Sequence, residues 1–196
     1  MGKKHELNLH EYFLKLYGNE NTPEYKAARL NFIKSLAAYC VVSYILQIKD
    51  RHNGNIMISE SGHLIHIDFG FIFDYSPGKD MRFESANFKL IQEYIDIMGG
   101  GGQAEPYKLF VRKVVQGFLA VRQHADEFYN LTELMYQSGF PCFKPHSMEA
   151  LRDRFKQDLT TFEAAAHMFR LVRDAHDKWT TRGYDLIQQM QNDIYR

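Results

Sequence analysis

A short stretch of the chain holds polar side chains that suit phosphoryl transfer. Asp50 and Asn55 are near enough in sequence for one short loop to present both, and Asp68 opens the tripeptide Asp-Phe-Gly further on. Carboxylate and carboxamide oxygens suit Mg²⁺, a hard cation that is usually shared with substrate phosphates. These residue types therefore predict a metal-dependent phosphoryl-transfer site.

The segment between Asn55 and Asp68 predicts a β-hairpin. Residues 56–59 form the first expected strand, Ser61-Gly62 lies in the turn, and residues 63–67 form the returning strand. An antiparallel hairpin of this length brings Asp68 back beside Asn55. The carboxylate and the carboxamide should then meet at neighbouring strand ends.

Two motifs resemble those of a known family. K-D-R-H-N-G-N-I and G-H-L-I-H-I-D-F-G-F resemble the catalytic and metal-binding loops of the phosphatidylinositol 3-/4-kinase superfamily. The order Asp-Arg-His at 50–52 differs from the His-Arg-Asp of protein kinases. The motifs are most similar to type III phosphatidylinositol 4-kinases, and the tail G-Y-D-L-I-Q-Q-M-Q-N-D-I is closer to the alpha than to the beta type. The resemblance covers the chain from about residue 8 to its end.

The resemblance implies ATP and Mg²⁺ as cofactors and suggests roles for four residues. Asn55 and Asp68 match the metal ligands. Asp50 and His52 share the proton transfer and the contact with the γ-phosphate, and the sequence leaves open which of them is the base. Arg51 between them is expected to be a structural ion-pair partner rather than a substrate contact.

The resemblance also predicts where the two substrates bind. Met57 and Ile67 match positions that floor the adenine pocket. The activation loop is expected over residues 68–89, where Lys79 and Arg82 would meet the lipid headgroup. Relatives that act on phosphorylated inositides resemble one another in a dense basic run here. The sparse cations of this loop favour phosphatidylinositol itself.

Helical patterns surround the hairpin. A helix is expected from Asn8 to Tyr17, and Thr22-Pro23-Glu24 starts a long one that runs to about Ile48. The second half of that helix is apolar nearly all round, which predicts burial on all sides. Further helices are expected at 88–98, 106–124, 128–137, 148–155, 160–175 and from 181. Ser147 is expected to cap the helix at 148–155, and Thr160 with Glu163 to form a capping box for the next one. The expected fold class is α+β, mainly α: a kinase-like C-terminal lobe with a short β-hairpin that carries both loops.

Composition excludes several classes of protein. Lys plus Arg and Asp plus Glu number 24 each, which argues against a nucleic-acid-binding protein. Cys40 and Cys142 have no spacing typical of a disulfide framework or a metal site. The polar N-terminus lacks a signal peptide, and the apolar run 36–48 is too short to span a bilayer.

A cytoplasmic protein, peripheral at the cytosolic face of a membrane, is expected. Trp179 and the last helix could touch lipid, although packing on the lobe is favoured.

The function expected from the resemblance is that of a phosphatidylinositol 4-kinase catalytic lobe, acting in phosphoinositide signalling. A kinase also needs a β-rich N-terminal lobe over the ATP phosphates. Residues 1–49 instead predict helices, so residues 1–196 are expected to be a C-terminal lobe without its N-terminal lobe, inactive in isolation. The alternatives are a non-catalytic kinase-fold module for partner or membrane binding, and a protein kinase of the same superfamily.

Overall fold

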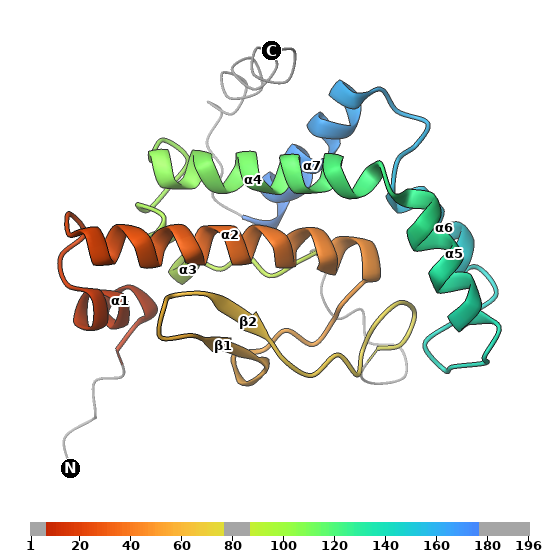
Figure 1. The fold of residues 1–196 in the computed structure, drawn as a ribbon, viewed down its shortest axis with the longest axis horizontal. Coiled ribbons are helices and arrows are strands. Elements are labelled where there is room, and N and C mark those ends of the chain that lie inside the picture. The colour runs from red at the N-terminus through yellow and green to blue at the C-terminus, as the bar shows by residue number, and fades with distance from the viewer. Residues whose placement is uncertain (1–6, 77–86, 177–196) are drawn as a thin grey trace.

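The computed structural model describes residues 7–76 and 87–176, which form helices around one small hairpin (Figure 1). In chain order the elements are α1 (Leu9–Tyr17), α2 (Pro23–Leu46), a 3₁₀ turn (Asn53–Asn55), β1 (Ile56–Ile58), β2 (Leu64–His66), α3 (Gln92–Ile97), α4 (Glu105–Arg122), α5 (Ala125–Tyr136), α6 (Ser147–Arg154) and α7 (Thr161–Ala175). The mainly helical fold class is confirmed.

The first two helices begin at capping residues, and the predicted cap of the second at Thr22 is confirmed. Asn8 and Glu11 form a capping box at the start of α1, which ends before Gly18 at a φ of 82°. The Thr22 side chain accepts a hydrogen bond from the Tyr25 backbone, and Pro23 occupies the first position of α2. Local side-chain chemistry therefore sets the start of the helix that leads to the predicted loops.

Helix α2 forms the centre of the core. It packs against α4 on one side and against β2 on another (Figure 1). Phe32, Leu36 and Ile45 are almost fully buried. The prediction that the second half of α2 is buried on all sides is wrong. Ala38 and Val42 are exposed on a face of the helix that neither α4 nor β2 covers. Helix α2 is long and apolar enough to cross a membrane, but half of its most apolar stretch is buried inside the lobe.

The hairpin lies on α2 through its turn and its second strand. Ile56 pairs with His66 and Ile58 with Leu64, so both strands are slightly shorter than predicted. The Leu64 backbone N–H donates to Ser35 Oγ at 2.9 Å, and Asn31 Nδ2 donates to the Ser61 carbonyl at 2.9 Å. The long helix therefore positions the hairpin directly.

Two predicted details of the later helices are wrong. Residues 88–91 precede α3 instead of belonging to it, because Phe88 and Leu90 alternate into the core. Ser147 does not cap α6. Its hydroxyl donates to the Asp74 carboxylate, and His146 occupies the cap position. The capping box of Thr160 and Glu163 at α7 is confirmed. The expected helix from residue 181 lies outside the described residues.

We expect the hairpin turn to tolerate no side chain at Gly62. Gly62 has a φ of 86°, and a Cβ there would lie 2.7 Å from the Ala28 carbonyl oxygen of α2. Gly62→Ala should lower the free energy of unfolding by about 3 kcal/mol, from left-handed strain plus the clash. Urea unfolding measures this change.

Gly100→Ala is the matched control, because Gly100 has a similar φ of 82° and a Cβ added there would have nothing within 4 Å. It should cost only about 1 kcal/mol. Equal losses for the two variants would contradict the close packing of the turn on α2.

Candidate functional site

The chain enters the predicted catalytic loop directly after α2. Asp50 and Asp68 both have left-handed backbones, with φ values of 59° and 58°. Aspartate is among the few residues that tolerate this region. The Ile67 backbone N–H donates to the Asn55 carbonyl at 3.0 Å, which extends the hairpin pairing by one step. Asp68 therefore follows the residue paired with Asn55, as predicted.

The two predicted metal ligands present oxygen atoms in a way that fits Mg²⁺. Asn55 is 7% exposed, and its Nδ2 donates to the Asp50 carbonyl at 3.0 Å. This bond orients the amide and leaves its Oδ1 with no donor among the described residues. Asp68 Oδ1 accepts from the Gly70 backbone at 3.0 Å, so the other carboxylate oxygen can face a ligand.

Arg51 holds the two loops together. It is 2% exposed, and its guanidinium donates to the carbonyls of Lys49 and Ile67, at 2.8 Å each, and of Asp68. The expected structural role is supported, because these partners among the described residues are backbone carbonyls of the chain on both sides of the site. Arg51 fixes the backbone on both sides of the site.

Asp50 and His52 lie next to each other. His52 Nε2 is 3.8 Å from Asp50 Oδ2, and the His52 side chain is 59% exposed. His52 Nδ1 accepts a hydrogen bond from the Gly54 backbone N–H at 3.1 Å. A neutral imidazole with Nδ1 as acceptor carries its proton on Nε2. That proton therefore points into the space beside Asp50.

The predicted adenine-floor residues share one face of the hairpin. Met57 is 53% and Ile67 38% exposed, and Ile65, cross-strand from Met57, is also 38% exposed. Leu64 and His66 are buried on the opposite face. The alternation in β2 could have identified Ile65, because it lies two residues from Ile67 on the same side.

The two hairpin histidines lie apart from each other. His63 bonds Ser61 Oγ at the turn, whereas His66 is buried and stacks on Tyr39. The two imidazoles therefore do not share a site.

One cation of the expected activation loop reaches the catalytic loop. Lys89 Nζ donates to Asn53 Oδ1 at 2.6 Å. This bond joins the end of the expected activation loop to the 3₁₀ turn that carries Asn55. Lys79 and Arg82 lie outside the described residues.

The segment after Asp68 is anchored at its base. The Phe73 N–H donates to the Leu46 carbonyl at 2.9 Å, and the Asp74 N–H to the Cys142 carbonyl at 3.0 Å. Desolvation lowers the pKa of the Lys49 ammonium, which donates to the Phe73 carbonyl. The segment thus starts from fixed points on the end of α2 and on the loop before α6.

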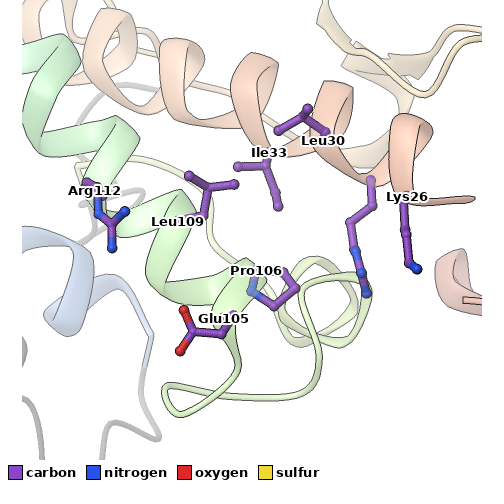
Figure 2. A pocket seen from close by; sticks show the side chains of 8 residues that line it. Lys26, Leu30, Ile33, Glu105, Pro106, Leu109 and Arg112 are labelled. Atoms are coloured by element: carbon purple, nitrogen blue, oxygen red, sulfur yellow. The ribbon is translucent and has the colours of Figure 1, made fainter. Parts of the chain in front are cut away.

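Two further observations bear on the site. A pocket of about 500 Å³ lies between α2 and α4, lined by apolar side chains and by Lys26, Arg29 and Arg112 (Figure 2). This pocket is remote from Asp50. Of the α2 residues that line it, Ile33 is the nearest to the C-terminal end of the helix, and it lies roughly 20 Å from that end.

Among the described residues, no three His, Cys, Asp or Glu side chains cluster as a metal site.

Comparison with known proteins shows which family the sequence resembles. The sequence model of the family described as "Phosphatidylinositol 3- and 4-kinase" matches residues 1–145. The chain is 45% identical over 195 residues to phosphatidylinositol 4-kinase STT4 of Saccharomyces cerevisiae, covering 99% of this chain and 10% of that protein. Phosphatidylinositol 4-kinase alpha 2 of Arabidopsis thaliana is 42% identical, over 99% of this chain and 38% of its own length. Phosphatidylinositol 4-kinase beta 1 of the same plant is 43% identical, over 95% and 17%. The chain thus spans well under half of each relative.

We expect His66 to make the fold sensitive to acid. Desolvation, with Arg51 and Lys89 nearby, lowers its pKa to about 4. Because the unfolded imidazole binds its proton near pH 6.5, stability should fall as the pH drops from about 6.5 towards 4. Between pH 7 and pH 5 the contribution of His66 should amount to about 2 kcal/mol.

His66→Phe keeps a ring to stack on Tyr39 and removes the titrating group. Urea unfolding at both pH values should show a smaller loss for this variant than for the wild-type chain. Equal losses would show that His66 is not the group responsible.

Proposed function

Because the chain belongs to the phosphatidylinositol 3- and 4-kinase family, we propose that it is the catalytic C-terminal lobe of a phosphatidylinositol 4-kinase. It would transfer the γ-phosphate of ATP to the 4-hydroxyl of phosphatidylinositol. The observation that carries the proposal is the pairing of Ile67 with Asn55, which gathers Asp50, Asn55 and Asp68 at one end of the hairpin. The relatives are all named phosphatidylinositol 4-kinases, which supports transfer to the 4-hydroxyl of the inositol ring.

Asn55 and Asp68 would hold Mg²⁺. The bound ion would neutralise the charge on the ATP phosphates. The Asp50 carbonyl keeps the Asn55 amide oriented with its oxygen outward, and the Gly70 N–H orients the Asp68 carboxylate. Both ligands are therefore held before any phosphate arrives, as electrostatic stabilisation requires.

The hydrogen bond from Gly54 supports different roles for Asp50 and His52. With its Nδ1 occupied, neutral His52 carries a proton on Nε2 and acts as a hydrogen-bond donor there. A donor beside the transferred phosphate stabilises the charge that it develops. The Asp50 carboxylate is then the proton acceptor for the inositol hydroxyl.

The exposed face of the hairpin would be the floor of the adenine site. Met57 and Ile67 would pack under the base, with Ile65 beside them. This floor needs a cover, which a separate N-terminal lobe would supply. We therefore expect the 196 residues by themselves to bind ATP weakly and to turn it over slowly or not at all.

The lipid would approach along the segment that follows Asp68. Lys79 and Arg82 would contact its headgroup, together with Lys89, whose Nζ is held at the catalytic loop by Asn53. A substrate embedded in a bilayer implies peripheral action at the cytosolic face of a membrane. The expected contact of the C-terminal helix with lipid lies outside the described residues.

A chimera provides the direct test of this function. The chain replaces the matching segment of yeast STT4, which supplies the rest of the kinase, and radiolabelled ATP is offered with Mg²⁺ and phosphatidylinositol vesicles. We expect phosphatidylinositol 4-phosphate from the chimera, none from the isolated chain, and at least a 100-fold loss in the chimera with Asp68→Asn.

Asp158→Asn is the control for that variant, because Asp158 is exposed on the loop before α7. It should leave the turnover unchanged. Label in a 3-phosphate, or in protein instead of lipid, would contradict the proposal. Full activity of the isolated chain would instead overturn the need for another lobe.

The roles of Asp50 and His52 can be separated in the same chimera. Asp50→Asn should lower kcat by about 10²- to 10⁴-fold, the usual contribution of a general base. His52→Gln keeps a hydrogen-bond donor and should cost less. Measurement of kcat and kcat/KM for both variants tests this assignment: if His52 were the base, His52→Gln would be the more damaging change.

A further inference from the structure

Helix α5 carries an apolar surface that its packing does not use. Leu131 is 66% and Leu134 68% exposed, the highest values among large hydrophobic side chains of the described residues. Met135 is 44% exposed on the same helical face, and Phe140, just beyond the helix, is 53% exposed. We call these four side chains the α5 patch.

The opposite face of α5 already secures the helix to the lobe. Ala125 and Thr132 are buried there, and the Phe128 ring packs on Phe155 of the segment after α6, with centroids 5.8 Å apart. The α5 patch is therefore not needed to hold the helix in place. Contiguous exposed apolar side chains of this kind mark interaction sites.

Helix α5 is connected to the segment that follows Asp68 by the side that carries Phe128 and Thr132. The Phe143 ring lies between Tyr136 of α5 and Phe73, with centroid distances of 5.7 and 4.9 Å. Asp74 is bonded to the same loop through the Cys142 carbonyl and to the first residue of α6 through the Ser147 hydroxyl. Figure 1 shows α5 beside this loop, at the right of the molecule.

We propose that the α5 patch inserts into the surface of the bilayer that holds the lipid substrate. This inference rests on the proposed function. The inositol ring must reach Asp50 while its acyl chains stay in the membrane, so the segment after Asp68 has to lie close to the bilayer surface. Because helix α5 is packed on that segment through Phe143, the α5 patch would also lie close to the membrane. Tyr75, 45% exposed on the segment, is of a type enriched at membrane interfaces.

The charges around the α5 patch are mixed. Glu127 lies one turn before Leu131, and Glu133 lies between Leu131 and Leu134 in the sequence. Lys144 is exposed on the loop that follows Phe140. A bilayer that contains phosphatidylinositol would attract Lys144 and repel the two glutamates. The apolar side chains, and not the net charge, would therefore supply the binding.

Vesicle binding of the full 196-residue chain tests the inference. The chain is sedimented with phosphatidylcholine vesicles that contain phosphatidylinositol, without ATP, so that the readout does not depend on catalysis. Leu131→Glu and Leu134→Glu should each weaken binding about tenfold, because each loses the burial of a leucine side chain. The same loss on pure phosphatidylcholine vesicles would show that it comes from insertion and not from the added charge.

Leu16→Glu is the matched control, since Leu16 is 49% exposed on α1, at the far end of α2 from α5 (Figure 1). It should bind vesicles as the wild-type chain does, and circular dichroism should show the same helix content for all variants. Three outcomes would overturn the inference: no binding by the wild-type chain, unchanged binding by both α5 variants, or an equal loss with Leu16→Glu. The second would assign the patch to a protein partner. Vesicle binding that depends on the α5 patch, with no turnover in the chimera, would defeat the proposed function alone.

Discussion

The site depends above all on the burial of one guanidinium group. A buried cation is costly unless its donors are satisfied, and Arg51 meets that condition with carbonyls from both loops. Its planar fork can bridge carbonyls that are far apart in the chain, which the point charge of a lysine cannot do in the same way. Because Arg51 holds the backbone at Lys49 and Asp68, the Asp68 carboxylate is not needed to fix the loop. The geometry of the candidate site thus depends first on backbone positioning and then on side-chain chemistry.

Helix α2 transmits that positioning to the rest of the lobe. Its middle holds the hairpin through Asn31 and Ser35, and its end holds the start of the next segment through the Leu46 carbonyl. Its other side packs on α4. A single rigid element therefore sets the distance between the hairpin and both loops, which a set of separate loops would not do.

The sequence predicted those parts of the fold whose causes are local. The Thr22 cap and the Thr160 capping box fixed two helix starts, and the turn at Gly62 fixed the register that brings Asp68 to Asn55. Details that depend on distant contacts were not predictable in this way. The hydroxyl of Ser147 is taken by Asp74, far away in sequence, so it does not cap its own helix. Residues 88–91 have a helical pattern, but the core accepts Phe88 and Leu90 only as an alternating pair. The orientation of His52 depends on a backbone N–H that no residue pattern reveals.

The left-handed backbone at Asp50 and Asp68 restricts how this site can vary over generations of mutation. For most amino acids this conformation raises the free energy of the folded state by about 1–2 kcal/mol, whereas for glycine the cost is almost nothing and for asparagine it is small. Replacement of either aspartate by a β-branched residue would therefore combine a chemical loss with a folding defect. Glycine or asparagine would remove the carboxylate and leave the loop intact. A lineage that lost the chemistry but kept the lobe should accumulate these two residues at positions 50 and 68 before any others.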